Sequence, residues 1–221
     1  MTRSLKIPHF LYADEVDLSY LDTLRTRLQA HLSNNQKLSY IPFIIKAVSI
    51  ALHGFPLLNA RVDQDSDDTN ASPRLVMREK HNIGVAMDTP QGLLVPNIKD
   101  VASLSILDIT AQLKHLQQLA QASKLSAIDL TGGTITVSNI GSIGGTYVSP
   151  IIVQSEVAIL GIGRARVVPA FDSKGGVVRK TVGNFSWSAD HRVIDGATMA
   201  RMGQKVKELV EEPGLMIAGL R

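Results

Sequence analysis

A strand-like stretch changes into a helix-like stretch within residues 186–196, SWSADHRVIDG. The residues before this change, 177–189, are strand-like, so we expect a strand there that is broken at Gly183. The residues after it, 195–210, carry apolar side chains at helical spacing. The chain therefore places a polar turn between a buried strand and its closing helix.

His191 and Asp195 lie four residues apart in this turn. Histidine is the usual general base near neutral pH, because its unperturbed pKa of about 6.5 lets it take up and return a proton. Asp195 is then expected to orient the imidazole or to hold the loop. The alternative is a structural histidine followed by a helix that Asp190 or Asp195 caps.

The remaining pattern places helices first, then strands, with further helices between them. We expect helices at 14–32, 41–53 and 105–122, and strands at 74–80, 83–88, 92–98, 134–140 and 157–162. We further expect Ser39 to cap the second helix, a turn at Gln91 and Gly92, and a loop over 63–73. This order favours an α+β fold of two layers, with helices covering a mixed sheet, over a doubly wound nucleotide fold.

Composition excludes several classes of protein. The 221 residues contain no cysteine, which rules out disulfides, thiolate metal sites and a cysteine nucleophile. The net charge of +3 is too small to argue for nucleic-acid binding. The histidines have no metal-ligand spacing, so no metal is expected. The most apolar run, 41–52, contains Lys46 and is shorter than the ~20 residues of a membrane span, so no membrane partner is expected.

Two glycine-containing stretches are further candidates for a site. Residues 131–147 place Ser138 and Asn139 at the end of a strand, followed by glycines that permit close approach of a ligand. The alternative is a strand flanked by ordinary turn glycines. Residues 161–166, GIGRAR, begin like a dinucleotide fingerprint but lack its third glycine and the following helix. Their glycines are expected to end a strand, with arginines that are solvated or meet an anion.

Taken together, these stretches resemble dihydrolipoamide acyltransferases, the core enzymes of 2-oxo acid dehydrogenase complexes. The resemblance covers nearly the whole chain and is carried by 7–10 (IPHF), 82–88 (NIGVAMD), 133–147, 157–161 (VAILG) and 190–197 (DHRVIDGA). The branched-chain type is the most similar, through SWSADH at 186–191 and HNIGVAMD at 81–88. Related antibiotic acetyltransferases carry a second histidine where Asp190 stands, which argues against that branch.

The resemblance implies a trimeric, chloramphenicol-acetyltransferase-like fold and acyl transfer between dihydrolipoamide and coenzyme A. His191 would be the base, Ser138 the donor to the oxyanion, and Asp195 the residue that fixes the loop and the imidazole. Matching the family position by position implies coenzyme A contacts at Arg25, Ser39, Asp88, Gln117, Asn139 and Gly163.

The resemblance also implies an assembly. His191 would face Ser138 across a trimer interface, and trimers would build a larger cage, a 24-mer. The apolar end, 215–220, is expected to dock on a neighbour. No lipoyl-lysine hairpin or Pro/Ala-rich linker is found, so residues 1–221 are expected to be one catalytic core, without lipoyl and peripheral-subunit-binding domains.

Partners would be the lipoyl domain and, through domains not found here, the decarboxylase and dihydrolipoamide dehydrogenase components. The expected compartment is the bacterial cytoplasm or the mitochondrial matrix. Two other functions stay open at this point: a cage core without catalysis, and a coenzyme-A-dependent acetyltransferase that acts on a free small molecule.

Overall fold

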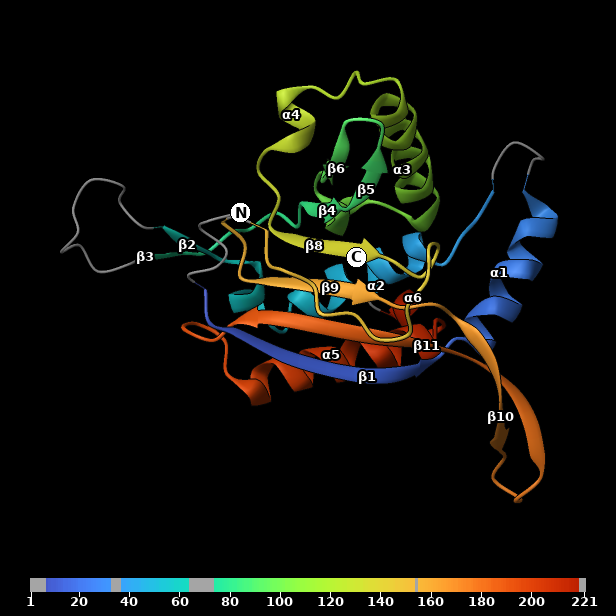
Figure 1. The fold of residues 1–221 in the computed structure, drawn as a ribbon. Helices are drawn as coiled ribbons and strands as arrows, with labels where there is room; N and C mark the ends of the chain where they lie inside the picture. Colours follow the sequence, from blue (N-terminus) through green and yellow to red (C-terminus); the bar gives the residue numbers. More distant parts are fainter. Residues whose placement is uncertain (1–6, 33–36, 64–73, 154, 219–221) are drawn as a thin grey trace.

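A mixed seven-stranded sheet forms the centre of the computed structural model, which describes residues 7–32, 37–63, 74–153 and 155–218. Its strands are β1 (His9–Asp17), β4 (Ile83–Val85), β7 (Asn97–Ile98), β8 (Ile135–Asn139), β9 (Ala158–Ile162), β10 (Arg166–Phe171) and β11 (Val177–Asp190). They lie in the order β1-β11-β9-β8-β4-β7, and β10 pairs with β11 (Figure 1). β8 runs parallel to β4 and β9, and the other pairs are antiparallel.

Helices form the second layer. The long ones are α1 (Ser19–His31), α2 (Ile41–Leu52), α3 (Ile106–Gln121) and α5 (Gly196–Glu211), and the short ones are α4 (Ala127–Leu130), α6 (Leu215–Ala218), η2 (Pro56–Asn59) and η3 (Val101–Ser103). Two small hairpins complete the fold: β2 (Arg61–Asp63) with β3 (Arg74–Val76), and β5 (Met87–Thr89) with β6 (Gly92–Leu94). α2 and α5 pack together behind the sheet (Figure 1). The α+β architecture expected from the sequence is confirmed.

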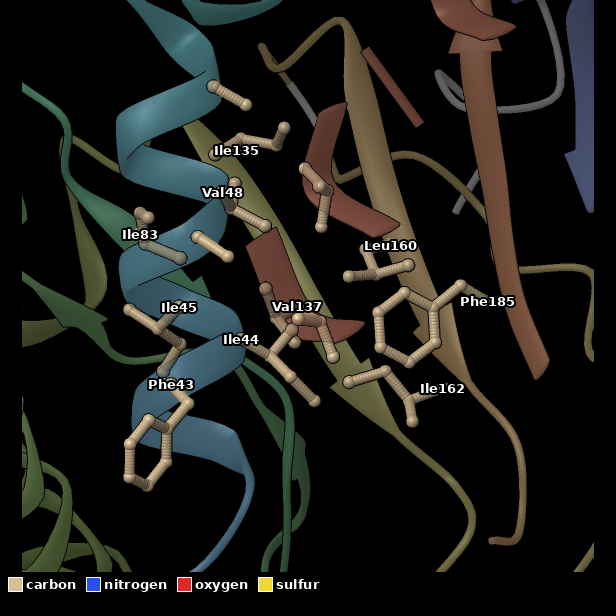
Figure 2. Packing of buried hydrophobic residues seen from close by; sticks show 14 of the residues in the cluster. Phe43, Ile44, Ile45, Val48, Ile83, Ile135, Val137, Leu160, Ile162 and Phe185 are labelled. Carbon is tan, nitrogen blue, oxygen red and sulfur yellow. The ribbon is translucent and has the colours of Figure 1, made fainter. Parts of the chain in front are cut away.

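The core lies between α2 and the central strands. Figure 2 shows Ile44 and Val48 of α2 packed against Val137, Leu160 and Phe185 of three adjacent strands. Removing each such side chain from water contributes on the order of 1.5–3 kcal/mol. This apolar seam fixes the helical layer on the sheet.

Lys46 is the exception within α2, because it is only 4% exposed. Its Nζ donates to the carbonyl oxygens of Val101, Ala102 and Leu104 at 3.4, 3.0 and 2.7 Å. These contacts satisfy the carbonyl groups at the end of η3, and burial lowers the pKa of the lysine. The charge that interrupts the apolar run therefore ties α2 to the loop before α3.

Several expected elements are confirmed. The helices expected at 41–53, 105–122 and 195–210 are α2, α3 and α5, and the strands expected at 134–140 and 157–162 are β8 and β9. The strands expected at 74–80, 83–88 and 92–98 are present as the shorter β3 to β7. The expected turn joins β5 to β6 through Pro90 and Gln91. Gly92, which opens β6 and pairs with Thr89, adopts a φ of 99°.

The helix expected over 14–32 is wrong in its first turn. Asp14, Glu15 and Asp17 belong to β1, which pairs along its whole length with β11, and α1 begins only at Ser19. The acidic residues suit a helix start by charge, but the hydrogen bonds to β11 determine their conformation. Long-range pairing here outweighs local preference.

Two other expectations also fail. β11 is continuous through Gly183, because the backbone of this residue pairs with Val16 of β1. Glycine suits the position for another reason: a Cβ there would lie only 3.1 Å from the side chain of Leu18. Ser39 does not cap α2, whose N-cap residue is Tyr40 and makes no side-chain cap bond.

The expectation for the GIGRAR stretch is confirmed, because β9 ends at Ile162 between its two glycines. Arg164 and Arg166 are exposed, and the guanidinium of Arg166 lies 3.5 Å from the carboxylate of Glu15.

Two expectations reach beyond the described residues. The loop over 63–73 lies outside them except for Asp63, which ends β2. At the C-terminus, α6 contacts α2, and Met216 is buried in the chain's own core. Leu215 and Ile217 are 42% and 72% exposed, and residues 219–220 are not described. Of the helices that are described, none is long and apolar enough to cross a membrane.

An ion pair shapes the turn between β11 and α5. Asp190 is fully buried and accepts from Arg192 through Nε at 2.9 Å and Nη2 at 2.6 Å. Its carbonyl oxygen accepts from the backbone of Val193 and Ile194 at 3.0 and 2.9 Å. Of Asp190 and Asp195, the two residues left open as the cap of α5, Asp190 is not the cap, because it anchors the turn that carries His191.

We expect Asp190→Asn to lower the free energy of unfolding by about 2–3 kcal/mol, because hydrogen bonds to charged groups contribute about 1.5–3 kcal/mol. Urea denaturation followed by circular dichroism measures this change. Arg192→Lys, which keeps the charge but loses the planar fork, should give a smaller loss. An unchanged unfolding midpoint in Asp190→Asn would contradict a structural role for the pair.

Candidate functional site

His191 is the first residue after β11 and is exposed. Its backbone nitrogen donates to the carbonyl oxygen of Pro8 at 2.8 Å, and its ring meets the ring of Phe10 edge-on at 5.3 Å between centroids. Pro8 and Phe10 therefore restrain His191 on one side, and the Asp190–Arg192 pair fixes the turn on the other. An imidazole in this position is accessible to a ligand and still restricted in its orientation.

Asp195 is the N-cap residue of α5. Its Oδ1 accepts from the backbone nitrogen of Thr198 at 2.7 Å, and this hydrogen bond lowers the pKa of the exposed carboxyl. Among the described residues no hydrogen bond joins Asp195 to His191. The aspartate therefore shapes the turn through the helix start, which is the capping role that the sequence left open.

Ser138 and Asn139 end β8, as expected. Ser138 pairs with Gly161 of β9, which pairs with Ser186 of β11, so His191 lies five residues further along the sheet. At about 3.3 Å per residue and 4.8 Å per strand, Ser138 and His191 are roughly 15–20 Å apart in one chain. Within one chain the two expected catalytic residues therefore lie at opposite ends of the sheet.

A cleft of about 340 Å³ opens at the Ser138 end of the sheet. Three of the expected coenzyme A contacts line it: Ser39, Asn139 and Gly163. Tyr40 and Arg164 line it as well. The sequence did not single out Tyr40, although its place directly before a helix with Pro42 in the first turn was visible. Polar groups from three separate segments thus converge on one cavity.

Arg25 reaches this cleft through Tyr40. Its guanidinium carbon lies 5.2 Å from the centroid of the Tyr40 ring, and its Nη2 lies 2.8 Å from Oδ1 of Asp22. Asp22 also accepts from the Tyr40 hydroxyl at 2.7 Å, and burial together with this carboxylate raises the pKa of Tyr40 to about 12. The phenol therefore stays protonated, and the arginine supplies a fixed positive charge beside the cleft.

Glycines allow the wall of the cleft to close. A Cβ at Gly163 would lie 2.1 Å from the carbonyl oxygen of Thr146, and a Cβ at Gly141 would lie 2.5 Å from the carbonyl oxygen of Gly163. Asn139 supports the same turn, because its Oδ1 accepts from the backbone nitrogen of Gly141 at 3.1 Å. The glycine of the incomplete fingerprint is thus required by chain packing at the cleft.

Asp88 and Gln117 do not line the cleft. Both are exposed, on β5 and α3, which pack against each other at the β4–β7 side of the sheet (Figure 1). The structure of one chain therefore separates these two expected contacts from Ser39, Asn139 and Gly163.

A second cleft of about 340 Å³ adjoins the turn that carries His191. It is lined by Leu57, Val62, Arg74, Leu75, Arg192 and Val193. Across the described ranges, no three histidine, aspartate or glutamate side chains gather as a metal site would require.

Comparison with known proteins identifies the family. Residues 1–218 match the model of the catalytic domain of 2-oxoacid dehydrogenases acyltransferase. The chain is 48% identical over its full length to the mitochondrial lipoamide acyltransferase component of the branched-chain alpha-keto acid dehydrogenase complex of Mus musculus, and covers 45% of that protein. It is 37% identical over 95% of its length to the dihydrolipoyllysine-residue acetyltransferase component of the Bacillus subtilis pyruvate dehydrogenase complex, of which it covers 46%. The chain thus spans about half the length of the curated relatives it matches.

Solved structures agree with this result. A structure of Azotobacter vinelandii dihydrolipoamide acetyltransferase superposes with a TM-score of 0.89 at 32% identity, covering 98% of this chain and 87% of that one. Chloramphenicol acetyltransferase superposes with a TM-score of 0.60 at 15% identity, covering 95% of this chain and 92% of that one, which confirms the expected fold. The chain belongs to the 2-oxoacid dehydrogenase acyltransferase family, whose catalytic domain it contains.

Proposed function

We propose that this chain transfers an acyl group from a dihydrolipoamide thioester to coenzyme A, as the core of a 2-oxo acid dehydrogenase complex. The placement of His191 carries this proposal. Its imidazole is exposed at the end of a buried strand and is oriented by Phe10 and by the backbone of Pro8. That arrangement suits a general base that must meet an incoming substrate.

The chemistry requires proton transfer and charge stabilisation. A thiol with a pKa near 8.5 is mostly protonated at pH 7, so a base accelerates its attack. His191 takes the proton from the coenzyme A thiol while the sulfur forms a bond to the acyl carbonyl carbon. When the resulting intermediate collapses, its bond to the lipoyl sulfur breaks and the imidazolium protonates that sulfur. The Ser138 hydroxyl donates to the oxyanion between these two steps.

Two copies of the chain are needed to complete this site. Because Ser138 and His191 lie roughly 15–20 Å apart in one chain, neither can act on the same carbonyl group within it. A head-to-tail contact that joins the His191 end of one copy to the Ser138 end of the next generates a ring when the rotation between copies closes. We therefore propose a homotrimer, and a cage built from such trimers.

The Azotobacter vinelandii structure supports this assignment of roles. It was determined to investigate a serine, a histidine and an asparagine in the catalytic mechanism, and the histidine and asparagine are four residues apart, as are His191 and Asp195. The serine precedes that histidine by 52 residues, and Ser138 precedes His191 by 53. We infer that Asp195 acts on the turn, through its cap of α5, and exchanges no proton.

Coenzyme A is proposed to bind along the cleft beside Ser138. Arg25 and Arg164 would meet phosphate groups, while Ser39 and Asn139 would hydrogen-bond polar groups of the ligand. Gly163 would let the ligand lie against backbone. Asp88 and Gln117 do not line the cleft of a single chain, so contacts from them would require another part of an extended ligand or a neighbouring copy.

The partners are proposed from the relatives. The branched-chain and pyruvate dehydrogenase relatives are both named as components of complexes, so a lipoyl domain would deliver the acyl group and a decarboxylase would load it. Dihydrolipoamide dehydrogenase would then reoxidise the dihydrolipoamide product. Residues 1–221 would act as one catalytic core. Since the relatives include mitochondrial and bacterial proteins, either the mitochondrial matrix or the bacterial cytoplasm fits as the compartment.

A branched acyl chain is proposed because the relatives at 48% identity are branched-chain components, whereas the acetyltransferase relatives share 37–38%. The test mixes the purified protein with coenzyme A and isobutyryl-, isovaleryl- or acetyl-dihydrolipoamide and measures acyl-coenzyme A. Faster turnover of the branched substrates supports the proposal. An intact assembly without turnover would indicate a cage core alone, and acetylation of a free amine or hydroxyl would indicate a small-molecule acetyltransferase.

His191→Ala should lower kcat by at least the 10²–10⁴-fold typical of a lost general base, because no group then takes the thiol proton. Acyl-coenzyme A formation measures the rate, and size-exclusion chromatography checks that the assembly is intact. His115→Ala, an exposed histidine on α3, is the matched control and should retain the wild-type rate. A His191→Ala protein with near-normal kcat would show that another group is the base.

Ser138→Ala should lower kcat by about 10²–10³-fold, the usual loss for one oxyanion donor. Coenzyme A affinity, measured by isothermal titration calorimetry, should stay nearly unchanged because the hydroxyl acts mainly in the transition state. Ser173→Ala, in the exposed turn between β10 and β11, is the control. Weaker binding with an unaltered kcat would instead make Ser138 a simple contact residue.

A further inference from the structure

Glu156 is a buried carboxyl group two residues before the start of β9. It is only 5% exposed, and its Oε2 has no hydrogen-bond partner among the described residues. The carboxyl group lies over Gly133, two residues before β8, where a Cβ would come within 2.9 Å of its Oε1. Burying an ionised carboxylate without a full set of partners is costly, so this position favours the neutral acid.

The surroundings of the carboxyl group are polar and mostly uncharged. Thr136 and Asn97 are buried beside it, and Oδ1 of Asn97 also lacks a partner within the described chain. Arg78 is the charged side chain that acts on Glu156, and its guanidinium donates to the carbonyl oxygen of Gly133. Burial raises the pKa of Glu156 to about 8, an effect that Thr136 and Arg78 partly offset.

Two charged residues of β2, Arg61 and Asp63, change the pKa of Arg78. Arg61 lowers the pKa of this arginine after the larger effect of burial, and Asp63 raises it. Both belong to β2, beside the cleft that adjoins the His191 turn. A protonated Glu156 offers an O–H donor to acceptors that otherwise have no partner, which a carboxylate does not.

A short run of backbone contacts connects Glu156 to His191. The next residue, Val157, accepts from the backbone nitrogen of Asp190 at 2.8 Å, and Ala158 then pairs with Ala189. Asp190 anchors the turn that carries His191. The segment at Glu156 therefore contacts the end of β11 directly before His191.

We propose that Glu156 is a positioning residue that works as a neutral carboxylic acid. Wedged between the starts of β8 and β9, it holds the end of β11 in the place that His191 requires. Its ionisation would put a charge into this seam and displace the strand end. Measurements of activity test this proposal only if the proposed acyltransferase function is correct, whereas measurements of unfolding test it independently of that function.

Glu156→Gln tests the proposal, because the amide has the shape of the neutral acid and cannot ionise. The pKa of the folded protein, about 8, lies above the value of 4.5 for a free glutamate, so the native state keeps a proton that the unfolded chain has lost. The stabilising effect of the neutral acid is fully present below pH 4.5 and is lost as pH rises through about 8.

The expected stability result follows from this linkage. Between about pH 4.5 and 8, the unfolding equilibrium constant of the wild type should rise relative to that of Glu156→Gln, by up to about tenfold per pH unit, and then level off. Glu79→Gln removes an exposed carboxyl group beside Arg78 and should not reproduce this effect. Denaturant titrations across the pH range measure all three proteins.

The activity of the assembled protein tests the positioning role. Between about pH 7.5 and 9, kcat of the wild type should fall relative to that of Glu156→Gln, with KM for coenzyme A unaffected. If the pH dependence of stability differs between the wild type and Glu156→Gln but the pH dependence of kcat does not, the positioning role is overturned. If the two proteins agree in the pH dependence of both stability and kcat, the claim that Glu156 is a neutral acid is overturned. Failure of Glu156→Gln to assemble would also overturn it. A wild type without acyl transfer would refute the proposed function, and the denaturant titrations would still judge the neutral acid.

Discussion

The hydrogen-bonded ladder on both sides of β11 is the constraint on which the rest of the structure depends. β11 runs for 14 residues, paired with β1 on one side and with β10 and then β9 on the other. Its last residue, Asp190, is fully buried and paired with Arg192, so the chain leaves the sheet at a fixed point and in a fixed direction. The hydrogen bonds of β11 therefore determine where His191 lies.

The same ladder separates the two halves of the site. The parallel pairing of β8 with β9 and the antiparallel pairing of β9 with β11 place Ser138 at one end of the sheet and His191 at the other. A cleft lies at each end, and each holds only part of the polar groups that the proposed acyl transfer needs. A rigid sheet cannot bend to join its own ends, so the proposed mechanism requires the two groups to meet between copies of the chain.

Local signals predicted those parts of the fold whose determinants lie close together in sequence. Ser105 and Asp108 form the capping box of α3, which short-range spacing can detect. The strand at Asp14 and Glu15 was missed because its conformation is set by partners about 170 residues away on β11. The same pairing keeps β11 continuous through Gly183, a residue that in isolation indicates a break.

Site residues were predictable in type but not in arrangement. The motif around His191 identified the strand-to-helix turn, yet the buried role of Asp190 depends on contacts with Arg192 and on its depth in the sheet. Spacing alone also left open whether Asp195 orients the imidazole or caps α5, and the hydrogen bond to Thr198 decides for the cap. Glu156 carried no signal in sequence, because its chemistry arises from burial.

The most direct measurement of the two-copy site mixes two inactive proteins. His191→Ala and Ser138→Ala chains, each with its own affinity tag, are co-assembled in equal amounts and purified through both tags. If each site takes His191 from one copy and Ser138 from the next, every mixed trimer has one complete site in three. Acyl transfer should then return to about a third of the wild-type level in doubly tagged trimers, or about a quarter in a randomly mixed cage. Verified mixed assemblies whose activity stays at the level of the single variants would contradict the account.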